Sequence, residues 1–315
     1  MVFALRKAGL AGLTLLAASV LIFLALEIVP GDPARIMLGI NATEDAVTAL
    51  RERLGLDLPP LRRYLAWISG VATGDLGSSY TYSEPVSSLI ADRVVVSLPL
   101  ALLALVLSTA IAIPVGMVAA RNRGGLVDTV VMGFTQLGIA IPNFWFALLL
   151  VYTFAIALRL VPAGGFPGWE AGIGPALGAL ALPAVALALP QAAILARLVR
   201  SALLETFRED YIRTARAKGA SQRRVVWRHA LRNAMIPIVT IMGLQFAYLL
   251  SGTIIIENVF YLPGLGRLVF QAISLRDLVV VESVVLVLVG IVVAVNLVVD
   301  LLYAALDPRL RRQAA

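Results

Sequence analysis

The segment from Asp210 to Ala234 carries the densest cluster of charged side chains in this sequence. It is DYIRTARAKGASQRRVVWRHALRNA and contains seven Lys or Arg residues, one acid and His229, the only histidine of the chain. A single His and the absence of Cys leave little material for a catalytic dyad or a metal site. The cluster therefore predicts a basic binding surface, and no residue of the chain is a catalytic candidate.

Sequence motifs for nucleotide or bond-cleaving chemistry are missing. The chain has no G-x-x-x-x-G-K-[ST], no G-x-S-x-G and no H-E-x-x-H, and its two lysines are Lys7 and Lys218. The tetrapeptide LSGT, at Leu250–Thr253, lies inside an apolar run, so we interpret it as a coincidence. These absences disfavour a membrane enzyme, and we expect no metal or other cofactor on this chain.

A sharp turn is expected in the middle of the basic segment. Gly219 suits the left-handed position that follows a helix, and Ser221 can cap the start of a second helix. The first helix would bury Phe207, Tyr211 and Ala215, and the second would bury Trp227, Leu231 and Met235. Small residues would surround the corner between them, so it could enter a groove on another protein. The alternative is a basic loop that lies on anionic lipid.

The elements that hold this segment are expected to cross a membrane. Of the 315 residues, 60% are hydrophobic and 14% are charged, against about 25% charged residues in soluble domains. Apolar blocks of about 20 residues match the span of a bilayer-crossing helix. We predict an all-α polytopic membrane protein with six transmembrane helices, at about 9–29, 97–120, 130–158, 174–199, 235–256 and 281–305.

The distribution of basic residues predicts the orientation of these spans. With the N-terminus inside, 17 of the 26 Lys and Arg residues fall on the inner side and 9 on the outer side. Cytoplasmic loops carry such an excess, so both termini are expected in the cytoplasm. The first span exceeds the apolar core of a signal peptide, and we expect it to be retained. The +7 net charge is then explained by basic segments on the cytoplasmic side of the membrane, and no nucleic-acid partner is expected.

The long outer segment at about 30–96 is expected to contain short amphipathic helices. Thr43 is a candidate cap of the first, whose apolar face would be Val47, Leu50 and Leu54. A second would place Leu61, Leu65 and Ile68 on one face, and SEPVSSLIADRV is a candidate third. The segment could cap the bundle or dock an external partner.

Polar residues within or beside the spans are the remaining site candidates. Gln136, Asn143 and Gln245 lie inside predicted spans, where polar side chains usually face protein or water. After the fifth span, the segment ENVFYLPGLG is expected to form a non-helical turn near the outer surface. It could be an ordinary loop or an outer gate formed by Glu257, Asn258, Pro263, Gly264 and Gly266. In the second case Glu257 would meet an ammonium group or a metal charge on the substrate.

The basic segment resembles the cytoplasmic coupling loop of ABC importer permeases. Ala215 and Gly219 match the second Ala and the Gly of that loop. The departures from the general pattern are Arg213, Thr214, His229 and Arg232. With these departures, the segment looks like the version of the dipeptide/oligopeptide/nickel subfamily, first-permease type. IVPGDPARIMLG, LRERLGLDLPPLRRYLAWISGV, GDLGSSY and ENVFYLPGLGRLVFQAI also look like landmarks of that subfamily.

The resemblance implies a type I (MetI-like) importer permease fold with a long first extracytoplasmic loop. Its parts would be an N-terminal helix and loop (1–96), a five-helix core (97–305) with a coupling loop at 201–234, and a cytoplasmic tail (306–315). Such a permease forms half of a pathway in the cytoplasmic (inner) membrane of a bacterium or archaeon. The resemblance assigns contact with the ATPase to Arg213, Thr214, Ala215, Arg216, Ala217, Lys218, Gly219, Ala220 and Ser221.

The implied partners are a homologous second permease, two ATPase subunits that carry ATP and Mg, an external solute-binding protein and the lipid bilayer. In such permeases the spans that hold Gln136, Asn143 and Gln245 flank the pathway. The substrate would be a di- or oligopeptide, although nickel or another small solute fits the same motifs. A motor-free channel or ion-coupled transporter is disfavoured because charged residues are essentially absent midway along the spans. A further alternative is a structural anchor whose basic loop recruits a scaffold without transport.

Overall fold

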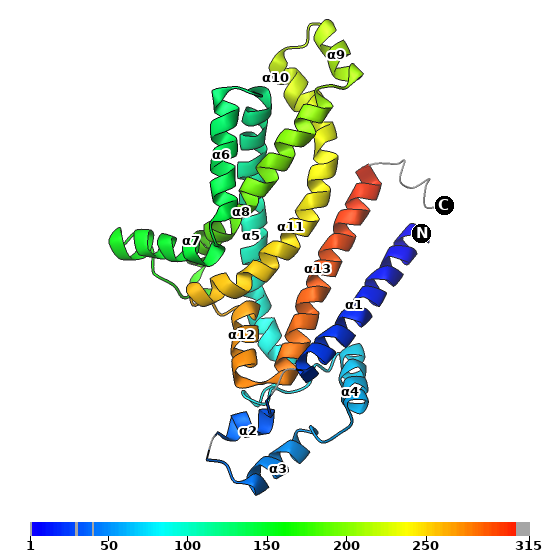
Figure 1. The fold of residues 1–315 in the computed structure, drawn as a ribbon, viewed down its shortest axis with the longest axis vertical. Coiled ribbons are helices and arrows are strands. Elements are labelled where there is room, and N and C mark those ends of the chain that lie inside the picture. Colours follow the sequence, from blue (N-terminus) through cyan, green and yellow to red (C-terminus); the bar gives the residue numbers. More distant parts are fainter. Residues whose placement is uncertain (1, 29–30, 40, 307–315) are drawn as a thin grey trace. The chain divides into compact units, whose positions relative to one another are not determined.

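The computed structural model describes residues 2–28, 31–39 and 41–306 of the chain (Figure 1). It divides into two units. Unit 1 comprises residues 1–97 and 263–297, and unit 2 comprises residues 98–262 and 298–315. Within the described residues the structure is helical without strands, and a single isolated bridge pairs Ser78 with Pro85. The predicted domain division at residue 96 stays a prediction. Residues 263–297 belong to the same unit as the N-terminal part of the chain.

Unit 1 is built around the meeting of three helices. Its elements are α1 (Val2–Ile28), α2 (Pro33–Leu38), α3 (Glu44–Arg53), α4 (Pro60–Thr73), the start of α5 (Val86–Arg121), α12 (Leu265–Leu275) and most of α13 (Leu278–Leu306). The buried cluster of α5, α12 and α13 contains Val86, Leu89, Leu268 and Val284. The backbone N–H of Leu265 donates to Ser97 Oγ at 2.7 Å, which joins α12 to α5.

The short helices of the outer segment follow the sequence prediction in part. Thr43 caps α3 and Val47 is buried, as expected. In α4 the predicted apolar residues Leu61 and Leu65 are exposed, because α4 packs through Tyr64, whose ring meets Phe23 of α1 at 5.5 Å. The expected third amphipathic helix is instead the first part of the 36-residue helix α5.

Unit 2 contains the remaining helices. They are the rest of α5, α6 (Leu126–Ala140), α7 (Asn143–Leu150), a π-helix (Val151–Ala157), a 3-10 turn (Trp169–Ala171), α8 (Ile173–Thr206), α9 (Asp210–Ala217), α10 (Gln222–Arg224), a second π-helix (Val225–Ala230), α11 (Leu231–Val259) and the end of α13. Its core is rich in alanine, and small residues let the helices approach closely. The predicted tail from residue 307 onward lies outside the described residues.

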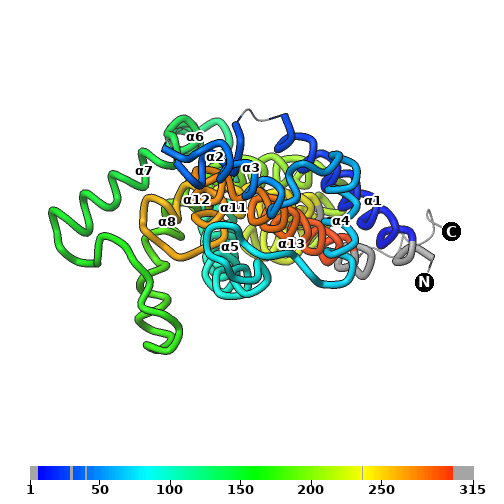
Figure 2. Tube along the Cα trace, turned by 90° about the horizontal axis from the view of Figure 1, so that it is seen from below, coloured from blue at the N-terminus to red at the C-terminus, as the bar shows by residue number. Residues whose placement is uncertain are grey.

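Five described helices are long and apolar enough to cross a membrane: α1, α5, α8, α11 and α13. The sequence predicted a sixth span at 130–158 with a kink at Pro142. The structure instead breaks it into α6 and α7 with its following π-helix, bent by 98° (Figure 1 and Figure 2). Pro142 has no N–H, and Ile141 before it is extended, with φ −80° and ψ 124°. If α6 and the segment that begins with α7 are counted as one bent span, the described residues contain six candidate spans, as predicted.

Close packing between α5 and α8 depends on Gly116. A Cβ added to Gly116 would lie 2.6 Å from the carbonyl oxygen of Ala196 and 2.7 Å from the side chain of Val199. We predict that Gly116→Ala destabilises the fold by roughly 1–3 kcal/mol, because the two helices must separate. The matched control is Gly133→Ala in α6, where a Cβ has open space and alanine favours the helix. Thermal unfolding in detergent measures both, and equal melting temperatures would contradict the prediction.

Candidate functional site

The turn predicted at Gly219 is present, and we call residues 210–224 the Gly219 turn. α9 ends at Ala217, and Gly219 has φ 78°, the left-handed conformation that favours glycine. The backbone N–H of Ala220 donates to the carbonyl of Ala215 at 3.1 Å, which closes the helix end. Ser221 Oγ then accepts from the N–H of Arg224 at 3.4 Å and caps α10. The helix–Gly–helix geometry of the sequence prediction is confirmed.

The apolar residues that anchor this turn differ from the prediction. Ile212, Val225 and Val226 are buried, in the same core cluster as residues of α8 and α11. Tyr211 and Trp227, predicted on the buried faces, have 39% and 55% of their surface exposed. Phe207, Leu231 and Met235 do pack against that cluster, as predicted. Tyr211 leaves the first face because the chain exits helix α8 after Thr206 and re-enters a helix at Asp210. Trp227 leaves the second predicted face because it lies in a π-helix, whose residue spacing differs from that of an α-helix.

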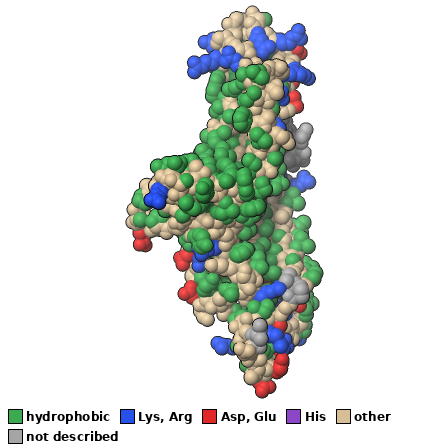
Figure 3. Space-filling model, turned by 60° about the vertical axis from the view of Figure 1, so that its left-hand side comes forward, with side chains coloured by type: hydrophobic (Ala, Val, Ile, Leu, Met, Phe, Trp, Pro, Cys, Tyr) green, Lys and Arg blue, Asp and Glu red, His purple; other side chains and the backbone are tan. Residues whose placement is uncertain are grey.

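The outer surface of the Gly219 turn is small, basic and accessible. Arg213, Thr214, Arg216, Ala217, Lys218, Gly219 and Ser221 are exposed, and Ala215 and Ala220 are half-buried. A Cβ added to Gly219 would meet nothing within 4 Å, so the corner itself is open. Figure 3 shows the blue Lys and Arg side chains gathered at the end of unit 2 that carries α9 and α10. Beside them, Trp227 borders a shallow hollow with Ser221, Arg223 and Arg224.

An ion pair between α6 and α8 was not anticipated from the sequence. Arg200 of α8 donates to both carboxylate oxygens of Asp128 of α6, through Nε and a terminal nitrogen, each at 2.6 Å. The backbone N–H of Gly124 donates to the same carboxylate at 2.9 Å. The available signal was a single acid, Asp128, three residues into an apolar helix. Such a residue needs a partner when it is buried.

The three pathway candidates lie on different helices of unit 2. Gln245 of α11 is 2% exposed, and its Nε2 donates to the carbonyl of Gln191 at 2.9 Å. Gln136 of α6 is exposed and accepts from Arg197 at 3.4 Å, while Asn143 is half-buried at the first residue of α7. Within the described part of the chain, no hydrogen bond joins any two of the three. The buried Gln245 Oε1 has no hydrogen-bond partner there.

The predicted outer gate differs from expectation in two ways. Glu257 and Asn258 lie in the last turn of α11, and the Glu257 side chain is fully buried, so it does not face open solvent. Gly264 caps α12, and Gly266 lies within that helix, so the predicted non-helical turn ends before Leu265. The gate role itself stays a prediction.

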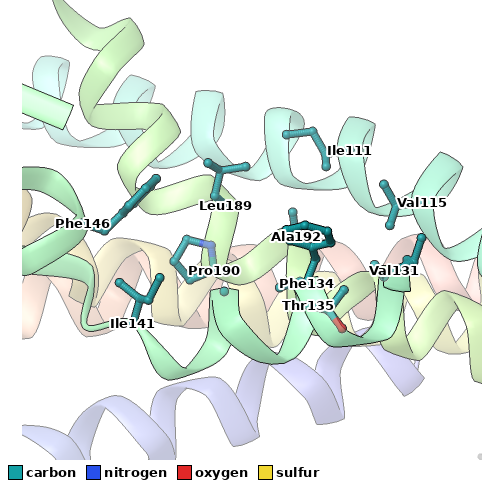
Figure 4. Close-up of a pocket in the computed structure, with 13 residues that line it drawn as sticks. Ile111, Val115, Val131, Phe134, Thr135, Ile141, Phe146, Leu189, Pro190 and Ala192 are labelled. Atoms are coloured by element: carbon teal, nitrogen blue, oxygen red, sulfur yellow. The ribbon is translucent and has the colours of Figure 1, made fainter. Parts of the chain in front are cut away.

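A cavity of about 460 Å³ in unit 2 is almost wholly apolar (Figure 4). It lies between α5, α6, α7 and α8, and its walls include Ile111, Phe134, Phe146 and Pro190. The hydroxyl of Thr135, on its wall, already donates to the carbonyl of Met132 at 2.8 Å. This cavity therefore offers almost no polar surface to a peptide or a metal ion.

Two family models match the chain. Residues 112–312 match the model of the binding-protein-dependent transport system inner membrane component, and residues 1–101 match the N-terminal model of such membrane components. The chain belongs to this family. It is a multi-pass permease subunit of the inner membrane, as the coupling-loop resemblance predicted.

Curated relatives match the permease over nearly its whole length. A protein of Sinorhizobium fredii, named "Probable peptide ABC transporter permease protein", is 40% identical over 93% of both chains. A glutathione transport system permease of Escherichia coli O6:H1 is 40% identical over 95% of both chains. A solved inward-facing structure of the MetNI methionine ABC transporter aligns with 70% of this chain and 96% of its own, at 20% identity and a TM-score of 0.59. The predicted type I (MetI-like) fold is confirmed.

We predict that the Asp128–Arg200 pair fixes α6 against α8 in this permease. Asp128→Asn should lower stability by roughly 2 kcal/mol, because Arg200 loses a bidentate charged partner. The Asp128→Asn/Arg200→Gln double variant should lose less than the sum of the single losses, as coupled residues do. Thermal unfolding of the purified permease measures all three.

The matched control is Asp210→Asn, whose pairing with Arg213 at 3.7 Å is exposed to solvent. Exposed pairs contribute little to stability, so this control should unfold like the unchanged chain. Additive effects of the Asp128 and Arg200 substitutions would contradict the proposed pairing.

Proposed function

We propose that this permease forms half of the transmembrane pathway of an importer for di- or oligopeptides. The names of the two relatives, at 40% identity over nearly the whole chain, support a peptide-like substrate. A homologous second permease would complete the pathway, and two ATPase subunits would power it. An external solute-binding protein would deliver the substrate. ATP and Mg would bind the ATPases, since this sequence has no phosphate-cradling loop.

The observation that carries the proposal is the open corner of the Gly219 turn. Its backbone is fixed by a capped helix on each side, and its anchors Ile212, Val225 and Val226 are buried. The corner therefore presents small residues on a rigid support, as a protein groove requires. A partner surface with acidic groups would complement the exposed Arg213, Arg216 and Lys218.

The same surface favours a protein partner over a lipid surface. Attraction to anionic lipid needs only charge, at about 1 kcal/mol per basic residue near the surface. Lipid anchoring gives no reason for a left-handed glycine at an open corner. The ATPase-coupling role thus accounts for both the charge and the stereochemistry.

The proposed orientation places the Gly219 turn and both termini in the cytoplasm and residues 30–96 outside. We predict that a single cysteine at Ser78, exposed in unit 1, reacts with an impermeant maleimide in intact cells. A cysteine at Ser201, exposed in α8 before the Gly219 turn, should react only after permeabilisation. The chain has no native Cys, so each label reports one site. The reverse labelling pattern would rule out this orientation.

We further predict that Gly219→Val uncouples ATP hydrolysis from uptake or weakens ATPase binding. A β-branched residue at φ 78° costs roughly 1 kcal/mol or more, and its bulk would block the open corner. Gly168→Val is the matched control, since Gly168 has φ 85° with open space around it but lies far along the chain from the turn. It likewise places a β-branched residue at positive φ in open space, and it should leave coupling intact.

Arg223→Ala, on the exposed face of α10, is the second control and should have a small effect. Uptake and ATPase co-purification are measured at equal membrane abundance for all variants. Lipid anchoring predicts the opposite order, with the lost charge mattering and the lost glycine not. Normal transport by Gly219→Val with failure of Arg223→Ala would refute the coupling role.

A further inference from the structure

Unit 1 contains a cavity of about 270 Å³ with a mixed charged and aromatic wall. It is separate from the Gly219 turn, which belongs to unit 2. Its walls come from α1, the 54–58 segment, α4, the 75–80 segment and the first turns of α13. The side chains that the argument uses are Phe23, Arg63, Trp67, Asp75, Tyr80 and Glu282.

The carboxylate of Glu282 is the unusual group in this cavity. Glu282 lines the cavity and is only 8% exposed. Among the described residues, no side chain or backbone group forms a hydrogen bond or ion pair with it. Burial without a donor disfavours the charged form of this carboxylate, and a positively charged ligand would stabilise that form.

The cation of the cavity wall is already engaged elsewhere. Arg63 forms an ion pair with Glu27 and donates to the carbonyl of Leu56 at 3.3 Å. Its guanidinium also lies over the ring of Phe23, 5.7 Å from the ring centre. Asp75, on the wall, adds a further negative charge. The charged side chains around the cavity thus carry an excess of negative charge.

Aromatic rings complete the wall and are held in place. Trp67 Nε1 donates to Ser283 Oγ at 3.3 Å, and the Trp67 ring meets Tyr64 at 6.2 Å. The segment that carries Tyr80 is fastened by Asp277, which accepts from Ser79 Oγ at 2.5 Å and from the N–H of Thr81 at 3.0 Å. These bonds fix the walls before any ligand arrives.

The Tyr80 hydroxyl remains available as a neutral polar group. Burial, together with the nearby charges of Glu282 and Asp277, raises the pKa of Tyr80 to about 12. The phenol is therefore protonated at neutral pH and adds no negative charge of its own.

We propose that this cavity binds a primary ammonium group, with Glu282 as its charge partner and Trp67 and Tyr80 as its aromatic walls. A carboxylate beside aromatic faces suits an organic cation, because both attract it. A metal ion would need several ligands, and the described residues hold no cluster of three His, Cys, Asp or Glu side chains that could supply them. The ammonium could come from a small amine or from the amino terminus of a short peptide. The proposal does not rest on peptide import.

The test measures binding to the full-length permease, purified in complex with its partner subunits in lipid nanodiscs. The probes are propylammonium, dialanine and N-acetyl-dialanine, which lacks the ammonium group, and saturation-transfer NMR reports binding. Propylammonium should bind saturably, and Glu282→Gln should weaken its binding about tenfold or more, as loss of a charged partner does. Glu84→Gln removes an exposed acid of the same unit and should leave binding unchanged.

The two peptide probes separate the sources of the ammonium group. Glu282-dependent binding of dialanine, without such binding of N-acetyl-dialanine, would indicate that a peptide terminus can occupy the cavity. Binding of propylammonium alone would assign the cavity to small amines. Tyr80→Leu keeps the charge of the site but removes its aromatic face, and it serves if Glu282→Gln does not assemble; it should weaken propylammonium binding severalfold.

Two results would overturn the proposal. One is the absence of saturable propylammonium binding to the unchanged complex. The other is equal propylammonium binding by the unchanged complex and every assembled Glu282 or Tyr80 variant. Neither result bears on peptide uptake, which the Gly219 variants test, so the two ideas can fail separately.

Discussion

A backbone N–H or C=O group left without a partner in hydrocarbon costs several kcal/mol, and this constraint shapes the whole permease. The long helices α1, α5, α8, α11 and α13 satisfy their backbone groups internally. Prolines inside α5, α8 and α11 leave those helices continuous. Among the described residues, the one sharp break in an apolar segment lies at Ile141 and Pro142, where the ring of proline removes a donor and forces the preceding residue to extend.

The same constraint explains why the proposed coupling element is built as it is. Outside hydrocarbon the chain can leave the helix, and at Gly219 it does so with capped ends on both sides. The buried anchors Ile212, Val225 and Val226 share one apolar cluster with Val199 of α8 and Ile238 of α11. A force applied to the open corner would therefore act on two membrane-crossing helices through packed side chains. Under the proposed function, this cluster would carry ATPase motion into the pathway.

Local stereochemistry and hydropathy determined what could be predicted from the sequence. The spans follow from apolar length, and Gly219 and Ser221 follow from preferences that depend on their own backbone. The exposure of Tyr211 and Trp227 could not be predicted, because it depends on where α8 ends and on a π-helix that shifts the residue spacing. A proline indicated the break at 142, but not its angle of 98°, which no local rule sets. The cavity beside Glu282 joins segments more than 200 residues apart in the chain, and one sequence gives no register between them.

The hydrogen-bond donors around a buried acid distinguish a structural residue from a functional candidate, whereas its position in the sequence does not. Asp277 and Glu282 lie five residues apart at the start of α13, and both are buried. Asp277 accepts hydrogen bonds from Ser79, from the N–H of Thr81 and, at 3.4 Å, from the N–H of Val280. Its carboxylate therefore fastens the segment that carries Ser79 and Thr81 and caps the start of α13. Asp128 is likewise satisfied by Arg200 and Gly124. Glu282 has no comparable donor among the described residues, yet it faces a cavity with fixed walls. A buried charge without a donor is costly to keep, and a ligand cation would remove that cost.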